Sequence, residues 1–157
     1  MGLDLILYKK NKNQNIEDMS MEEELDSELA YGRKTWVIAD FFRRRCTPIY
    51  EDCEYVVAEQ DWHEFIDSLE ELADVEFRDR LNFFLEMEYD ENIDDELYKK
   101  EYIYFERWLD ISLDNDAPCT LGLEWELAAV MRWYDANDEV QEAFDNDDEE
   151  VRLIVSY

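Results

Sequence analysis

The chain has 157 residues, of which 46% are hydrophobic and 15% are aromatic, and its 15 Lys and Arg stand against 44 Asp and Glu. So many apolar and aromatic side chains can form a substantial core, which excludes a disordered acidic tail. The net charge of −29 repels nucleic acid and anionic membranes, so neither is expected to bind directly. The length fits a single domain over residues 1–157.

The charge is divided unevenly along the chain. Residues 1–50 hold eight Lys or Arg and nine Asp or Glu, a net of −1, whereas residues 51–157 hold seven and 35, a net of −28. Adaptation to high salt, or a general need for solubility, would acidify the whole surface. The near-neutral N-terminal third and the strongly acidic remainder therefore favour a binding role for the acidity over these two alternatives.

The first third of the chain is predicted to hold one strand and one helix. Residues 2–10 alternate Leu with other side chains, a pattern typical of a strand buried on both faces. A polar loop follows, and Ser20 and Glu23 are then spaced as a capping box. We expect a helix that starts there or later and runs to about Arg45, with Gly32 inside it.

The middle of the chain is predicted to be mostly helical. A β-branched run over residues 53–58 predicts a second strand. Residues 60–73 carry apolar side chains at helical spacing and carboxylates on the opposite face, which predicts an amphipathic helix. Helices are also expected over 75–87 and 93–113, followed by a turn at 114–118.

The last third is predicted to be a helix and a strand. Residues 123–144 have the apolar period of a helix with a break near Asn137, and residues 151–157 alternate as a strand does. The expected fold class is therefore α+β: a helix-rich single domain with a small sheet built from both chain termini and a middle strand.

Short segments of the first 75 residues carry a resemblance. The opening Met-Gly-Leu-Asp at residues 1–4 is similar to the start of a family of small, uncharacterised phage and bacterial proteins, in which it continues as a strand. The likeness extends through residues 28–34, where the family has Tyr-Trp-Arg-Lys, and weakly to strand 53–57. Gly32 stands where the family has Trp. The resemblance implies an origin in a mobile genetic element and supplies no catalytic residues.

The cysteines and the basic residues have plain interpretations. Cys46, Cys53 and Cys119 are an odd set without metal-binding spacing, which indicates cytoplasmic thiols, although a Cys46–Cys53 disulfide is compatible with their spacing. No secretory signal or membrane-spanning run is expected. The basic groups at residues 9–12 and 43–45 are expected to balance the acids of the N-terminal part, and the second group also suits a helix C-terminus.

No arrangement for catalysis or metal binding stands out. His63, the single histidine, lies outside any His-Glu-x-x-His motif and is expected on the surface beside acidic side chains. Asp110, Asp114 and Asp116 are interpreted as a solvated helix end, and the run after Asp145 lacks the Gly of a calcium loop. We therefore expect no enzyme activity, no metal and no cofactor.

Two acidic runs form the candidate site. Residues 86–96 hold seven carboxylates and residues 135–150 hold nine, and neither run contains Lys or Arg. Tyr89 and Tyr98 are the expected exposed aromatic anchors within the acidic field. The candidate partner-binding residues are Glu86, Glu88, Tyr89, Asp90, Glu91, Asp94, Asp95, Glu96, Tyr98, Asp135, Asp138, Glu139, Glu142, Asp145, Asp147, Asp148, Glu149 and Glu150.

This spacing of charge points to a basic partner. Carboxylates four residues apart on a helix lie about 6 Å apart, close to the separation of successive phosphates on one DNA strand. In composition the acidic part is similar to phage proteins that imitate DNA. We therefore expect a non-enzymatic, phage-encoded inhibitor that blocks the nucleic-acid-binding surface of a host defence enzyme, of anti-CRISPR or anti-restriction type. An immunity-type protein that neutralises a basic toxin nuclease is the alternative.

Overall fold

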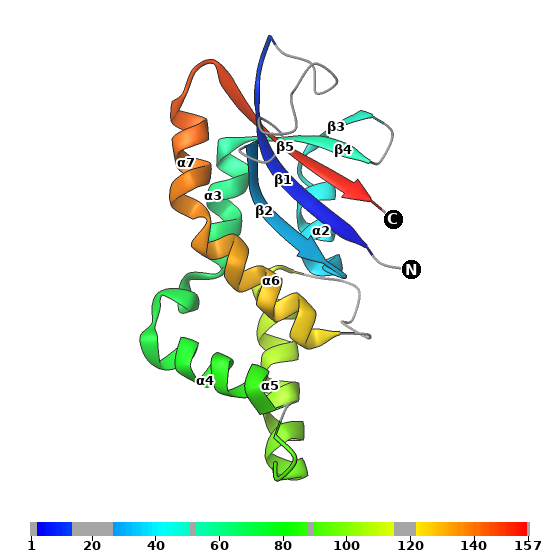
Figure 1. Ribbon diagram of the computed structural model, residues 1–157, viewed down its shortest axis with the longest axis vertical. Helices are drawn as coiled ribbons and strands as arrows, with labels where there is room; N and C mark the ends of the chain where they lie inside the picture. The colour runs from blue at the N-terminus through cyan, green and yellow to red at the C-terminus, as the bar shows by residue number, and fades with distance from the viewer. Residues whose placement is uncertain (1–2, 14–26, 51–52, 88–89, 115–121, 157) are drawn as a thin grey trace.

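The computed structural model describes residues 3–13, 27–50, 53–87, 90–114 and 122–156. They form a sheet with helices packed on one face and a helical hairpin that extends the molecule beyond the sheet (Figure 1). The strands are β1 (Asp4–Asn11), β2 (Glu28–Arg33), β3 (Thr47–Tyr50), β4 (Glu54–Val57) and β5 (Glu149–Ser156). The helices are α2 (Trp36–Arg43), α3 (Glu59–Ser68), the 3₁₀-helix η2 (Glu70–Ala73), α4 (Val75–Met87), α5 (Asp95–Ser112), α6 (Leu123–Asp135) and α7 (Asn137–Asp145).

The sheet joins the two ends of the chain. Its order is β2-β1-β5-β4-β3 and every neighbouring pair is antiparallel. In the central pair, Leu5 lies opposite Val155 and Leu7 lies opposite Leu153. The predicted α+β fold, with a sheet from both termini and a middle strand, is confirmed. Tyr157, at the end of the predicted last strand, lies outside the described residues.

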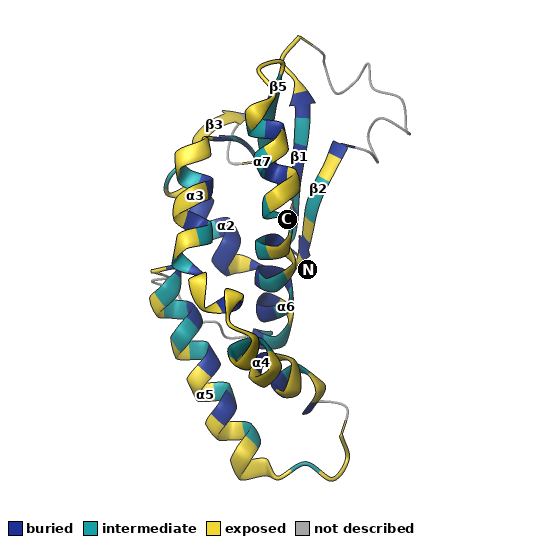
Figure 2. Cartoon of the chain, turned by 90° about the vertical axis from the view of Figure 1, so that its left-hand side faces the viewer, coloured by how far each residue is buried: buried dark blue, intermediate teal, exposed yellow. Residues whose placement is uncertain are grey.

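The two faces of the sheet differ in chemistry. Helices lie on one side of it (Figure 2), and the strands send alternate apolar side chains such as Leu5, Leu153 and Val155 into that layer. The other face carries a polar network in which Arg152 donates to Glu150, at 2.8 Å, and to Glu54, at 3.2 Å. One-sided burial with alternating side chains fixes the strand register, because a one-residue slip would exchange the two faces.

Aromatic side chains fill the layer between sheet and helices. The ring of Phe42 lies 6.1 Å from that of Trp62 and 5.2 Å from that of Phe65, and Trp133 packs 6.2 Å from Phe42. These four side chains come from α2, α3 and α6 and are fully buried. The indole Nε1 of Trp62 donates to Asn137 at 2.8 Å, which ties α3 to the start of α7. Burial of aromatic surface on this scale is the main stabilising contribution of the fold.

The hairpin of α4 and α5 has a cluster of its own. Phe84 stacks on Tyr98 at 5.5 Å and lies 5.3 Å from Phe105. Beside them, Arg80 makes a bidentate pair with the buried carboxylate of Glu101, at 2.7 and 2.9 Å. A planar guanidinium satisfies both oxygens of a buried carboxylate at once, which offsets the free energy of removing that charge from water.

The helix predicted to reach about Arg45 starts late, at Trp36, and the prediction that Gly32 lies inside it is wrong. Residues 28–33 form strand β2, which pairs with β1, and helix α2 begins at Trp36. Pairing with β1 and burial against α6 outweigh the local helical period. Ser20 and Glu23 lie outside the described residues. Strand β3 was also not predicted, because it contains Pro48; an edge strand tolerates proline, which has no N–H to donate.

The later helices were predicted more accurately. The helix predicted over 60–73 is present as α3 and η2, and those over 75–87 and 93–113 are present as α4 and α5. The break near Asn137 is confirmed, because α6 ends at Asp135 and α7 begins at Asn137.

Neighbouring side chains leave no room for a side chain at Gly32 in β2. A Cβ atom at this position would lie 2.9 Å from the Oγ1 of Thr35 and 3.4 Å from the Nε1 of Trp133. Both residues are fully buried, so neither can move without disturbing the core. We expect Gly32→Ala to lower the free energy of unfolding by about 1–2 kcal/mol, as overpacking does. Urea unfolding followed by tryptophan fluorescence measures it, and an unchanged midpoint would contradict the close approach.

Candidate functional site: two acidic surfaces

The cations of the chain form ion pairs with few of the described carboxylates. All fifteen Lys and Arg lie within the described residues. Six of them make ion pairs there, with eight described carboxylates in total. Most of the described carboxylates therefore have no Lys or Arg within ion-pair distance, and their field extends into solvent.

The second acidic run of the sequence forms a helix face. Helix α7 buries Val140 and Ala143 against the core, which turns Asp138, Glu142 and Asp145 outward, where all three are exposed. None of these three is in an ion pair with a described cation. The carboxylates therefore repeat at intervals of about 5–6 Å along a helix that is packed on the core and rigid.

Helix α3 adds carboxylates beside those of α7. The side-chain amide nitrogen of Gln141 lies 3.3 Å from Glu59 and 3.1 Å from Asp145, so one donor bridges acids of the two helices. The oxygen of the same amide lies 2.8 Å from the Nε2 of His63. We define the α3–α7 acidic face as a set of exposed residues. They are Glu59, Asp67, Asp138, Glu142 and Asp145.

Three other candidate residues of this run are occupied within the protein. Asp135 forms an ion pair with Arg78. Glu149 lies 3.9 Å from Lys9 and Glu150 lies 2.6 Å from Arg152. These carboxylates are less available to a partner because a resident cation screens each of them. Glu139, Asp147 and Asp148 are exposed.

The first acidic run surrounds the start of α5. Asp94 caps that helix, since its carboxylate accepts from the backbone N–H of Glu96 at 2.9 Å. Asp90 accepts from the N–H of Asn92, also at 2.9 Å. Two of the carboxylates thus fix the local backbone, as capping acids do. We define the distal acidic tip as the exposed carboxylates of this run, namely Glu86, Asp90, Glu91, Asp94, Asp95 and Glu96.

A hollow of about 290 Å³ opens within this tip. Phe83, Met87 and Ile93 supply apolar walls, and Glu86 and Asp90 add carboxylates to the lining. Phe83 is 54% exposed, which is high for an aromatic side chain. Apolar walls beside carboxylates match the aliphatic stem and charged end of a Lys or Arg side chain.

The prediction that Tyr98 is an exposed anchor is wrong. Its ring stacks on Phe84 and packs against the hydrophobic core, and its hydroxyl donates to Glu124. Tyr98 lies on the same side of α5 as the buried Phe105, so its position was decided by helical phase rather than by its acidic neighbours. Phe83, rather than Tyr98, is the exposed aromatic side chain of this region. Glu88 and Tyr89 lie outside the described residues.

The structure does not bring the two acidic runs together. Helix α7 lies beside α3 near one end of the sheet, whereas the start of α5 lies at the far tip of the helical hairpin (Figure 1). The α3–α7 acidic face and the distal acidic tip are therefore two separate surfaces. The first has the more regular array of charge, and the second has a hollow.

Comparison with known proteins gives no further guide. No protein-family model matches the chain, and no curated protein and no solved structure matches it. The assignment of function therefore depends on the chain's own surfaces.

Other kinds of site have little support in the described residues. Among them, no group of three or more His, Cys, Asp or Glu side chains is placed to hold a metal ion. No helix in the described ranges has the length and apolar character needed to cross a bilayer.

Cys46 and Cys53 are both free thiols, so the disulfide left open by their spacing is not formed. Burial, with Asp61 nearby, raises the pKa of the Cys46 thiol to about 12, which makes it a poor nucleophile.

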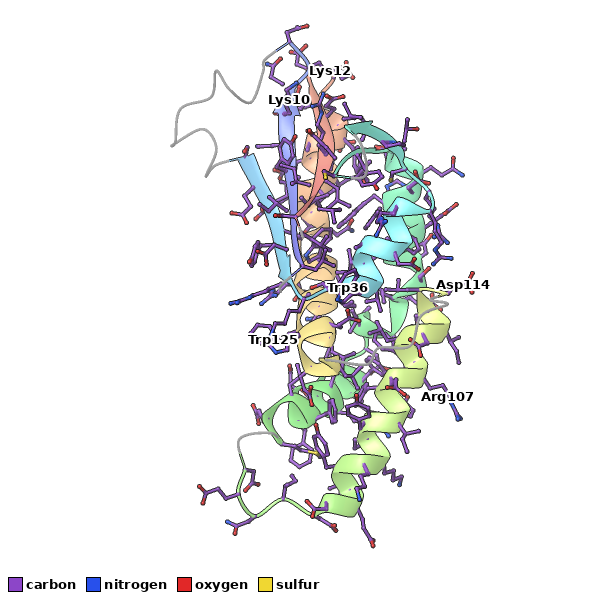
Figure 3. The ribbon with its side chains drawn as sticks, turned by 90° about the vertical axis from the view of Figure 1, so that its right-hand side faces the viewer. Lys10, Lys12, Trp36, Arg107, Asp114 and Trp125 are labelled. Carbon is purple, nitrogen blue, oxygen red and sulfur yellow. The ribbon has the colours of Figure 1, made fainter. Side chains whose placement is uncertain are left out.

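The basic residues of the N-terminal third are partly used in local contacts. Arg44 lies 3.1 Å from the carboxylate of Asp40, as expected for balancing of the N-terminal acids. Arg45 instead lies 3.4 Å from Glu64, which belongs to the acidic part of the chain. Sequence reasoning missed a second feature, the exposed indoles of Trp36 and Trp125 (Figure 3). The apolar period could not single out Trp36, because five of the eight residues of α2 are buried.

The uneven charge gives a prediction for stability. We expect the melting temperature to rise as salt is raised from low levels to about 0.1 M, where charges more than about 10 Å apart are screened. Mild acidification should also raise it, because the most strongly coupled carboxylates take up protons. A differential scanning calorimetry series over salt and pH measures both effects. A flat response would contradict the claim that the carboxylates act as one field.

The rise of the melting temperature on acidification is expected to be limited by Glu101. Its hydrogen bonds from Arg80 lower the pKa of the carboxyl group below its ordinary value. The resulting stabilisation is present above the unfolded-state pKa and is lost as the pH falls through the lowered pKa. The melting temperature should therefore pass through a maximum and fall again in stronger acid.

Proposed function

We propose that this chain is a non-enzymatic inhibitor that occupies the basic nucleic-acid-binding surface of a partner enzyme. The observation that carries the proposal is the α3–α7 acidic face. Asp138, Glu142 and Asp145 repeat at about 5–6 Å on a rigid helix, and none forms an ion pair with any of the fifteen cations of the chain.

The physical basis is imitation of a phosphate backbone. B-DNA carries about one charge per 1.7 Å of axis, and a single helix face has a lower density. Glu59 and Asp67 from α3 widen the face of α7 into a two-helix array. A cationic channel that binds this array must release its nucleic acid, because the channel cannot hold two polyanions at once.

We further propose a phage origin and a host defence enzyme as the partner, of restriction or CRISPR type. The support is the likeness of the chain's opening residues to a phage and bacterial family, together with the acidic composition of residues 51–157. The distal acidic tip would then be a second contact, with its hollow taking the stem of a Lys or Arg side chain.

The test is capture followed by displacement. The immobilised chain is incubated with lysate of the host at low salt, washed, and then challenged with an excess of duplex DNA. We expect the DNA to release a basic nucleic-acid-processing protein. A captured partner that stays bound in the presence of the duplex would contradict the proposal, and a small secreted nuclease as partner would favour the immunity-type alternative.

A further inference from the structure

The hollow of the distal acidic tip combines apolar side chains with carboxylates. Phe83, Glu86 and Met87 line it from the end of α4, at steps of three and four that keep side chains on one face of a helix. Asp90 and Ile93 line it from the segment that leads to α5. Met87 is 2% exposed and Phe83 is 54% exposed, so a buried and an open apolar group lie beside charged ones.

The size of the hollow suits one side chain. Its volume of about 290 Å³ lies just below the range of about 300–1,000 Å³ that is typical of small-molecule sites. It is therefore sized for a single long side chain rather than for a cofactor. The carboxylates in its lining favour a cation, and the apolar walls favour one that is carried on an aliphatic stem.

The chain itself shows how an aromatic ring and a carboxylate hold an arginine. The guanidinium of Arg80 lies 3.8 Å from the centre of the Tyr104 ring, and it pairs with Glu101 at 2.7 Å. Glu101 and Tyr104 are three residues apart on α5, which places carboxylate and ring on one side of the helix. Phe83 and Glu86 have the same spacing on α4.

A second arginine is held in the same way. The guanidinium of Arg45 lies 3.8 Å from the centre of the Phe41 ring and 3.4 Å from the carboxylate of Glu64. A guanidinium is planar, so it covers an aromatic face and offers a fork of N–H donors to a carboxylate, whereas an ammonium group does neither. A ring next to a carboxylate therefore selects arginine over lysine.

Phe83 and the carboxylates beside it have no such arginine from within the described chain. No described Lys or Arg lies over the ring of Phe83, and neither Glu86 nor Asp90 forms an ion pair with a described cation. The next residue, Phe84, already supplies an aromatic side chain to the hairpin cluster. The hollow therefore presents its ring and carboxylates to a cation from outside the chain.

We propose that this hollow binds one arginine side chain of the partner protein. The guanidinium stacks on the ring of Phe83 and donates to the carboxylates of Glu86 and Asp90, and the aliphatic stem contacts Met87 and Ile93. The inference rests on the proposed function only in assigning the arginine to the basic partner, and it narrows the cation at the tip from Lys or Arg to Arg. Aromatic and arginine side chains are the groups that most often carry binding energy at interfaces.

Titration of the chain alone with a small probe tests the proposal. The probe is N-acetyl-arginine methylamide, whose only charge is its guanidinium, and the amide NMR shifts of the isotope-labelled chain are followed at low salt. We expect the largest shifts at the residues that line the hollow. The lysine derivative should bind about two- to fivefold more weakly, because it lacks the planar stack and the fork. The citrulline derivative has a similar shape without the charge and should give no saturable shift.

Substitutions separate the ring from the charge. Phe83→Leu keeps an apolar wall but removes the ring, so it should abolish the preference for the arginine derivative over the lysine derivative. Glu86→Gln should weaken the binding of both derivatives. Val75→Ser is the matched control, because Val75 is 71% exposed on the same helix but does not line the hollow, and it should change neither. Thermal melts show that each variant still folds.

Four results would each overturn the proposal: equal binding of the arginine and lysine derivatives, saturable binding of the citrulline derivative, an arginine preference that survives in Phe83→Leu, or the largest shifts on the α3–α7 acidic face. Because the probe needs no partner, the outcome is separate from the displacement test of the proposed function. An arginine preference without displacement of nucleic acid would refute the proposed function alone. Displacement without an arginine preference would refute the arginine site alone.

Discussion

Reversing Asp138, Glu142 and Asp145 together to Lys is expected to slow association with the basic partner by about tenfold or more at low salt. The three carboxylates stand outward on α7 without resident cations, so their field reaches an approaching protein undiminished. Steering acts on the encounter, and the association rate should change more than the dissociation rate. Stopped-flow measurements at two salt concentrations give both rates.

The matched control is a triple reversal elsewhere. Glu28, Glu76 and Asp79 are also exposed, and their change to Lys alters the net charge by the same amount. If association depended only on net charge, the two triple variants would slow equally. That result would contradict a localised site on the α3–α7 acidic face, whereas a larger effect on α7 supports it.

Glu126→Ala is expected to lower the free energy of unfolding by about 3 kcal/mol, the largest effect predicted for a single substitution here. Glu126 is buried on α6, and its carboxylate accepts from the backbone N–H of Trp36 and, at 3.3 Å, from that of Val37. It therefore caps the start of α2 from another helix, in the place of a local capping residue. Removal leaves two N–H groups at a buried helix end without this acceptor.

Glu126→Gln separates the capping role from the charge. A glutamine keeps the shape and one acceptor oxygen, so we expect a loss of only about 1 kcal/mol. Urea unfolding followed by tryptophan fluorescence measures both variants. Equal losses for Ala and Gln would mean that the negative charge at the helix start dominates, and no loss for either would refute the capping role.

The fold could be predicted where local pattern and tertiary contact agree. The alternation over residues 151–157 and the helical period over residues 60–73 each placed apolar side chains on one face, and the structure buries described members of each, such as Leu153 and Phe65. The prediction failed for residues 28–33, because they become a strand by pairing with β1, more than 20 residues away in sequence. Leu5 with Gly32 is one such pair. The cap that Glu126 provides for α2 was not predicted either, because no local pattern links residues 90 apart in sequence.

The candidate site was predictable in composition but not in arrangement. The sequence identified both acidic runs, yet whether they meet depends on how the α4–α5 hairpin projects from the sheet. The partial burial of Tyr98 could have been inferred, because it lies seven residues before the buried Phe105 on the apolar side of its helix. Asp135 forms an ion pair with Arg78, and Glu150 forms one with Arg152. Arg78 comes from a separate part of the chain, so its pairing could not be read from local sequence.

The central claim is that this protein and nucleic acid exclude each other on one basic surface. Fluorescence anisotropy of a labelled duplex bound to the purified partner tests it, with the chain titrated in. We predict complete displacement, with an apparent dissociation constant for the duplex that rises linearly with chain concentration. A plateau with duplex still bound would show a ternary complex and would contradict the claim.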